Sequence, residues 1–274
     1  MTCIVVAGLG PVGTAVSEAL SHHPDVEVYL DDPYKGENLD FPSNITVDGV
    51  VVCVATPMSE DGSCYVDNIV DVFKKYGSNV KYLIRSTTNP LFLREFAHLD
   101  ITFSPEYIRG TTGANPTKEF LDSEFAIYGG GSMRWWHEIF VPILTNLKTV
   151  RFMTAEQASF AKYFLNGFLA TKVTFFNQAY EIYEACGGKD FDVVIDGLCL
   201  DPRVGLSHTQ VPGPDNQFGY GGHCFPKDMA AFAKFGEESG ANVQFLKDTI
   251  AANDRNRSTP PFDLFLSEIK ETLI

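Results

Sequence analysis

Six short apolar runs dominate the first 150 residues and constrain most strongly how this chain can fold. They are rich in Val and Ile and lack the alternation of a half-exposed strand, which indicates strands buried on both faces. Each run ends in turn or loop residues, and helix-compatible polar segments separate them. The runs lie at residues 3–10, 26–30, 49–57, 81–87, 101–106 and 124–130. We therefore predict a doubly wound, Rossmann-type parallel sheet covered by helices for residues 1–152.

A long proline-free segment with helical periodicity begins at Thr154. Thr154 and Gln157 fit a capping box, and Gly187 with Gly188 fits a helix stop. The resulting helix of about 33 residues exceeds the usual length of globular helices, which indicates a domain spine or a dimer element. Shorter helices around a loop rich in proline and glycine complete a predicted all-helical central or dimerisation domain, residues 153–274. The chain's own C-terminal helices could equally cover the apolar face of the long helix.

Charge and cysteine usage limit the partners and the compartment. Lys plus Arg number 21 against 35 Asp plus Glu, a net charge of −14, so nucleic acid and anionic membranes are poor partners. No apolar run reaches the roughly 18 residues of a membrane span, and the N-terminus lacks the basic region of a signal peptide. The six cysteines form no CxxC pair and no metal-ligand spacing. We expect a cytoplasmic protein without a bound metal.

A glycine-rich turn follows the first predicted strand. In "VAGLGPVG", Gly8, Gly10 and Gly13 form G-x-G-x-x-G between a strand and a helix. The first glycine allows the tight turn, the second lets a pyrophosphate approach the backbone, and the third lets the helix pack on the strand. The second strand ends in Asp31 and Asp32. We favour Asp32 as the acid for the adenosine ribose and interpret Asp31 as a solvated neighbour, which predicts NAD rather than NADP.

The segment "FGYGGHCFPKD" places Cys224 on a turn between glycines and a lysine–aspartate pair. Asp228 is predicted to be the N-cap of the following helix. A thiol beside a helix N-terminus and Lys227 should favour the nucleophilic thiolate form. The glycines at 219, 221 and 222 would let a substrate approach the backbone closely. Cys224 is therefore the candidate nucleophile.

Seven motifs occur in the order found in the UDP-glucose dehydrogenases. They are "VAGLGPVG", "VCVATPMSEDG", "RSTTNP", "FSPEYIRG", "AKYFLNGFLATKVTFFNQ", "DPRVG" and "FGYGGHCFPKD". The chain thus resembles the UDP-glucose and GDP-mannose dehydrogenase family over roughly residues 3–257. The resemblance implies an NAD-binding domain, a helical domain that forms a homodimer, and a sugar or nucleotide-sugar substrate.

The resemblance also implies a four-electron oxidation of a sugar C6 alcohol to a carboxylate with two NAD, UDP-glucose to UDP-glucuronate in the first place. A cysteine thiolate captures the intermediate aldehyde as a thiohemiacetal. The second hydride transfer gives a thioester, which water cleaves. The thiol keeps the aldehyde from leaving before its second oxidation.

Carried over by motif, the site residues fall into three groups. The resemblance makes Cys224 the nucleophile, while Lys162 and Asn166 stabilise the oxyanion. It gives Asp228 and Thr87 the task of positioning or activating water, and Glu106 that of a general base. The cofactor-binding positions are Gly8, Gly10, Val12, Gly13, Asp32, Thr56, Thr87 and Lys227. The substrate-binding positions are Tyr107, Ile108, Arg109, Arg203, Phe218, Gly219 and Gly221, with Arg203 reaching the substrate across the dimer.

Up to Ile274, no third strand–glycine–helix unit follows the helical region, whereas the family normally continues into a UDP-binding domain. We expect a compact dehydrogenase that retains activity. Three alternatives stay open: one subunit of a split enzyme, a non-catalytic NAD-binding module, and a two-electron hydroxyacid-type dehydrogenase.

Overall fold

The computed structural model describes residues 1–37, 46–108 and 115–258. The chain forms two units, Met1–Lys162 and a second one from Tyr163 onward, which are described separately. In the described part of the first unit, seven strands form one sheet in the order β2-β1-β3-β4-β5-β6-β7. They are β1 (Thr2–Ala7), β2 (Val26–Asp31), β3 (Gly49–Val52), β4 (Lys81–Ile84), β5 (Ile101–Phe103), β6 (Phe125–Gly130) and β7 (Thr149–Met153).

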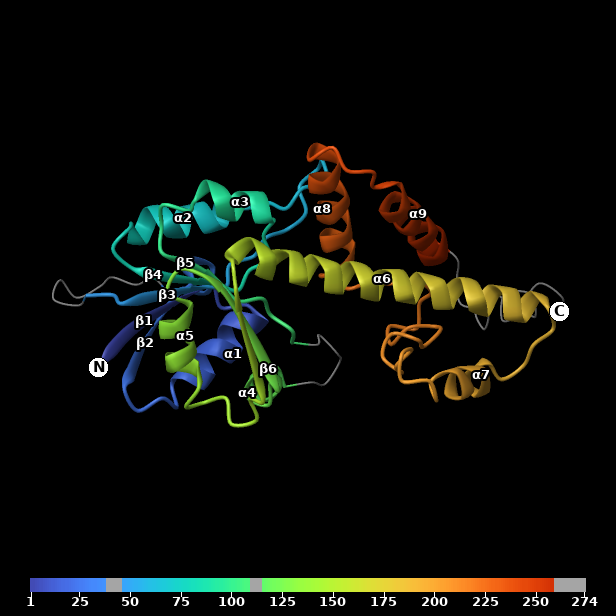
Figure 1. Ribbon diagram of the computed structural model, residues 1–274, viewed down its shortest axis with the longest axis horizontal. Helices are drawn as coiled ribbons and strands as arrows, with labels where there is room; N and C mark the ends of the chain where they lie inside the picture. Colours follow the sequence, from blue (N-terminus) through green and yellow to red (C-terminus); the bar gives the residue numbers. More distant parts are fainter. Residues whose placement is uncertain (38–45, 109–114, 259–274) are drawn as a thin grey trace. The chain divides into compact units, whose positions relative to one another are not determined.

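Helices cover both faces of this sheet (Figure 1). One apolar core joins α1, α4 and α5 to the sheet through residues such as Val16, Phe120 and Trp136. The opposite core joins α2 and α3 through Phe73 and Phe92. The bounds are α1 (Pro11–Leu20), η1 (Pro33–Lys35), α2 (Asp67–Tyr76), α3 (Pro90–Glu95), α4 (Pro116–Leu121) and α5 (Met133–Phe140). The predicted doubly wound architecture is confirmed.

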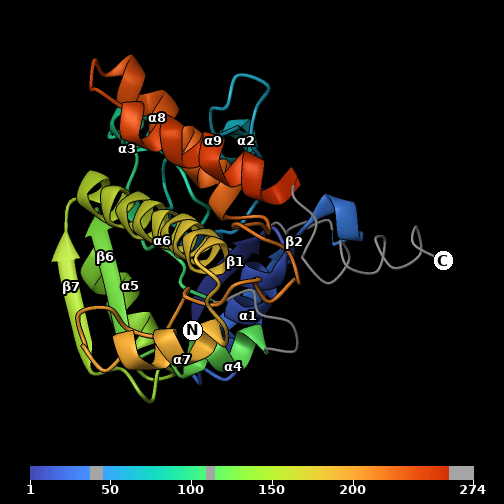
Figure 2. The ribbon, with the colours of Figure 1, turned by 90° about the vertical axis from the view of Figure 1, so that its right-hand side faces the viewer.

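Two features of the sheet differ from the prediction. β6 pairs with β5 in antiparallel register, so the sheet is only mostly parallel. β7 was not predicted, and it lies beside β6 at the edge of the sheet (Figure 2). Its residues alternate between half-buried and exposed, as an edge strand permits, and therefore lack the buried Val/Ile run that identified the others.

In the described residues of the second unit, every regular element is a helix, and loops connect these helices. The long helix α6 (Ala155–Ala185) begins in the first unit and continues into the second. The predicted capping box is confirmed, because Gln157 N donates to Thr154 Oγ1 and Thr154 N donates to Gln157 Oε1. Gly187 has a φ of +79°, which ends the helix as predicted. The remaining helices are α7 (Phe191–Leu198), α8 (Phe225–Glu238) and α9 (Gln244–Ser258).

Candidate active site

The glycine-rich turn has the geometry that dinucleotide binding requires. Gly8 has a φ of +88°, and a Cβ there would meet the backbone of Val54 at 2.8 Å. A Cβ on Gly13 would lie 1.8 Å from the Gly8 carbonyl oxygen, so α1 packs this closely only on glycine. A Cβ on Gly10 would meet no atom within 4 Å. The turn also lies where the strand order reverses between β1 and β3, the usual ligand crevice of such sheets.

The two aspartates at the end of β2 have different environments. Asp32 accepts a hydrogen bond from Leu9 N at 2.8 Å and caps η1, so its carboxylate lies against the glycine-rich turn. The interpretation of Asp31 as solvated is wrong. Asp31 is buried and accepts from Lys75 Nζ at 2.8 Å and from the Tyr76 hydroxyl at 2.5 Å. Burial, and then this hydrogen bond, raise the pKa of the Tyr76 hydroxyl.

These residues fit NAD. The open face of Gly10 leaves room for a pyrophosphate, the N-terminus of α1 offers backbone donors, and Asp32 offers acceptors for ribose hydroxyls. Val12 is half-buried within α1. Thr56 and Thr87 follow β3 and β4 at the same edge of the sheet, and the Cys64 thiol donates to the Thr87 carbonyl oxygen at 3.3 Å.

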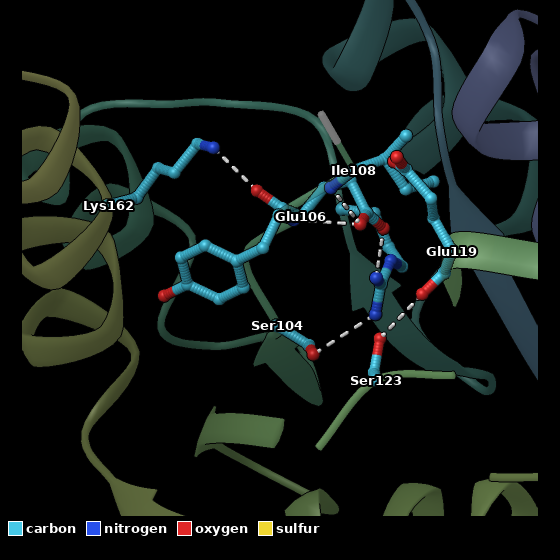
Figure 3. Close-up of polar contacts among 8 residues, drawn as sticks. Ser104, Glu106, Ile108, Glu119, Ser123 and Lys162 are labelled. Carbon is cyan, nitrogen blue, oxygen red and sulfur yellow. Dashed lines mark hydrogen bonds and ion pairs between the residues drawn. The ribbon is translucent and has the colours of Figure 1, made fainter. Parts of the chain in front are cut away.

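The Glu106 carboxylate accepts hydrogen bonds that order its own loop. One carboxylate oxygen accepts from Arg85, and the other accepts from Tyr107 N at 2.7 Å and Ile108 N at 2.9 Å (Figure 3). Burial alone would lower the pKa of Arg85, but the charge and hydrogen bond of Glu106 outweigh it and raise that pKa. These three hydrogen bonds order the loop, and the role of Glu106 as a general base stays a prediction.

Lys162 is anchored by the same loop. Its ammonium donates to the Glu106 carbonyl oxygen at 2.5 Å and lies 5.2 Å from the centre of the Tyr107 ring. These two contacts hold the ammonium against the loop. Arg85 was missed in the sequence, although it opens the "RST" segment directly after β4 and thus lies at the edge that carries the predicted site.

In the second unit, Asn166 and the "FPKD" segment form a buried polar cluster. Asn166 Nδ2 donates to Asp228 Oδ2 at 2.5 Å, and Lys227 Nζ pairs with Asp228 Oδ1 at 2.5 Å. Asn166 and Asp228 are 4% and 2% exposed. The prediction of Asp228 as N-cap is wrong, because Pro226 fits the first turn and α8 begins at Phe225.

Cys224 is the N-cap of α8 and is exposed. Its carbonyl oxygen accepts from Asp228 N at 2.9 Å, so the polar cluster lies one helical turn further on. Burial raises the pKa of the thiols of Cys3 and Cys53, the latter to about 12, so these two stay protonated. Among these three thiols, Cys224 alone is exposed.

The glycine-rich loop before Cys224 is held by two helices. Gly219 N donates to Asn177 Oδ1 on α6 at 2.8 Å, and Tyr220 N donates to Asn253 Oδ1 on α9 at 2.6 Å. α9 side chains occupy the space that a Cβ on Gly219 or Gly221 would need, whereas a Cβ on Gly222 would meet no atom within 4 Å. The open approach predicted for all three glycines is therefore present at Gly222 alone.

Arg203 and Phe218, two further predicted substrate residues, have other partners in the second unit. Arg203, with 88% of its side chain exposed, pairs with Asp201 through both carboxylate oxygens. Phe218 is half-buried and packs on Tyr180 at 5.8 Å between ring centres. Arg109 lies outside the described residues.

The predicted residues thus gather in two groups, one on each unit. Lys162, Glu106 and Tyr107 belong to the first, and Asn166, Lys227 and Asp228 to the second. Within the described ranges, no cluster of three His, Cys, Asp or Glu side chains could hold a metal ion, and no helix is long and apolar enough to span a membrane.

Comparisons with known proteins identify relatives of this chain. Residues 156–255 match the central domain of the UDP-glucose/GDP-mannose dehydrogenase family. UDP-glucose 6-dehydrogenase of Pseudomonas aeruginosa is 28% identical over 264 residues, which cover 86% of this chain and 56% of that protein. The chain therefore spans about half the length of the curated relatives that it matches first.

Solved structures share the fold. A UDP-glucose dehydrogenase from the archaeon Pyrobaculum islandicum aligns with a TM-score of 0.75 at 22% identity, covering 93% of this chain and 68% of that one. Mycobacterium tuberculosis 3-hydroxyisobutyrate dehydrogenase aligns with a TM-score of 0.67 at 17% identity, covering 95% of both chains. At these identities the likeness concerns the fold alone.

Proposed function

We propose that this chain oxidises the C6 alcohol of a nucleotide sugar to a carboxylate with NAD, because residues 156–255 match the central domain of the UDP-glucose/GDP-mannose dehydrogenase family. UDP-glucose is the first substrate to test. The observation that carries this proposal is the exposed Cys224 at the N-cap of α8, one turn before the buried Asn166–Asp228–Lys227 cluster. Core packing does not require a thiol at an exposed helix N-terminus.

NAD, when bound at the glycine-rich turn, supplies the hydride acceptor for both oxidations. The alcohol loses a hydride and a proton to become an aldehyde. The Cys224 thiolate then adds to the aldehyde carbon, and the resulting alkoxide takes up a proton to give a thiohemiacetal. Loss of a second hydride and a proton yields the thioester, and water releases the carboxylate and the free thiol.

The charged and amide groups of the candidate site have distinct tasks in this proposal. The Lys162 ammonium and the Asn166 amide stabilise the negative charge that develops on the substrate oxygen. Asp228, anchored by Lys227 and Asn166, orients water for thioester hydrolysis. Glu106 positions Lys162 through its loop, because it orders the backbone whose carbonyl oxygen binds that ammonium.

We expect Cys224→Ser to lower kcat by at least about a thousandfold, because a hydroxyl is a far weaker nucleophile than a thiolate. Rapid quenching of the parent protein during turnover should leave a sugar adduct on the peptide containing Cys224, detected by mass spectrometry. Cys186→Ser is the matched control, since Cys186 is also exposed but lies beyond the end of α6. Full turnover by Cys224→Ser would exclude the covalent step.

We also propose a cytoplasmic homodimer. All six cysteines are free, as a reducing compartment favours. Four large apolar side chains on α6 are exposed by 55–63%: Phe164, Phe168, Phe175 and Ile182. Their spacing of four, seven and seven residues places them on one face of the helix. A second copy of the chain is the occupant that a repeated apolar stripe fits best, because an isologous interface is self-complementary.

A further inference from the structure

Lys172 on α6 binds three carbonyl oxygens of the segment that carries Arg203. Its ammonium donates to Val204 O at 2.9 Å, Gly205 O at 2.7 Å and Ser207 O at 2.5 Å. A lysine has three N–H donors, so each donor finds one acceptor. Three convergent carbonyl dipoles repel one another, and a neutral side chain could not hold them together as a cation does.

Arg203 lies next to these carbonyls and is ordered although it is exposed. Arg203 N and Nε donate to Asp201 Oδ1, both at 3.0 Å, and Nη2 donates to Oδ2 at 2.5 Å. These contacts fix the direction of the side chain relative to its own loop. Lys172 fixes the loop itself to α6, since the segment between α7 and α8 has no strand or helix to hold it.

Three exposed leucines lie in the sequence just before this loop or within it. Leu198, Leu200 and Leu206 are 42%, 85% and 64% exposed. Large apolar residues on both sides of an ordered arginine are typical of an interface, where aromatic and aliphatic contacts surround one charged anchor.

We propose that Lys172 is a positioning residue that holds the 201–207 loop so that Arg203 is presented to the substrate bound by a second copy of the chain. This inference rests on the proposed dimer, on the proposed nucleotide-sugar substrate and on the role across the dimer that the family resemblance implies for Arg203. Lys172 itself touches no substrate; it acts through the loop backbone. The arginine supplies the local positive charge that an anionic substrate needs on a chain with a net charge of −14.

A double-mutant cycle tests this inference. Lys172→Met should raise KM for the nucleotide sugar about tenfold or more, while the affinity for NAD stays unchanged. Arg203→Ala should have the larger effect, and the double variant should be within about threefold of Arg203→Ala alone, because Lys172 acts through the arginine. Lys172→Arg, which keeps a multi-donor cation, should recover part of the loss. If the two increases in KM multiply in the double variant, Lys172 acts independently of Arg203 and the inference is wrong.

Amide hydrogen exchange supplies a readout that does not depend on activity. Lys172→Met should speed exchange in residues 201–207, whereas Arg203→Ala should leave the Lys172 contacts and that protection in place. Unchanged exchange in Lys172→Met would refute the inference whatever the enzyme does. If Arg203→Ala has no effect on KM while Lys172→Met still loosens the loop, it is the proposed role of Arg203 in the dimer that fails.

Subunit mixing separates action within a chain from action across the dimer. Mixed dimers of Cys224→Ser and Lys172→Met subunits should show turnover with the parent KM, which neither variant shows alone, because one site then combines an intact thiol with an arginine loop from a partner that keeps Lys172. An absence of regain in mixed dimers, with subunit exchange verified by mass spectrometry, would contradict presentation across the dimer.

Discussion

At the scale of single residues, the three glycines of the turn have three separable tasks. Gly13 brings α1 against the turn, Gly8 adopts a positive φ beside β3, and Gly10 leaves an open face. Two of these tasks concern folding, and the third concerns the ligand. Substitutions can therefore separate the stability of the turn from its affinity for the cofactor.

We expect Gly13→Ala to lower the free energy of unfolding by about 1–3 kcal/mol, because its Cβ would overlap a carbonyl oxygen that belongs to the backbone. Gly10→Ser should keep the parent's stability, since the position is open, has a φ of −67° and is a helix N-cap. Gly10→Ser should nevertheless weaken NAD binding by tenfold or more, because the serine side chain would occupy the space proposed for the pyrophosphate. Urea unfolding and calorimetric titration with NAD measure the two effects. Parent-like NAD affinity in Gly10→Ser would contradict the proposed site.

At the scale of elements, α6 connects both groups of predicted site residues. It carries Lys162 and Asn166 one turn apart, Lys172 on the loop side, and the exposed apolar stripe. One helix thus determines the spacing of the candidate oxyanion groups and the surface for a partner copy. Changes on different faces of α6 should affect different properties.

We expect Phe168→Glu to convert the dimer into a monomer, because a carboxylate buried in the apolar stripe would lack a partner. Glu184→Lys, an exposed change about 160° around the helix, is the matched control and should remain dimeric. Sedimentation velocity at micromolar concentration measures both. A monomeric parent, or a Phe168→Glu variant that sediments as the parent dimer does, would contradict the proposed role of the apolar stripe as the dimer interface.

Local patterns in the sequence predicted the elements better than the contacts between them. The capping box at Thr154 and the close packing of Gly13 on Gly8 involve neighbours within a few residues, and both are confirmed. The N-cap predicted at Asp228 was wrong because α8 begins one turn earlier, at Phe225 with Cys224 as its N-cap. The Arg85–Glu106 pair joins residues 21 positions apart, and the Lys172 carbonyl cluster joins residues more than 30 apart. Sequence spacing alone does not reveal which distant backbone atoms a charge will meet.

At the scale of the whole molecule, the proposed activity must be carried by a chain that spans about half the length of its first curated relatives. The second unit contributes the candidate nucleophile, and the first contributes the dinucleotide turn. A split enzyme would turn over only after a second nucleotide-binding polypeptide is added. A non-catalytic module would bind NAD and produce no NADH with any nucleotide sugar.

The central claim is a four-electron oxidation through a thioester on Cys224. The most direct measurement is the amount of NADH formed per molecule of UDP-glucose consumed, followed at 340 nm with limiting sugar and excess NAD. The account predicts two NADH per sugar and a carboxylate product. One NADH per sugar, as a two-electron hydroxyacid-type dehydrogenase would give, or none, would contradict it.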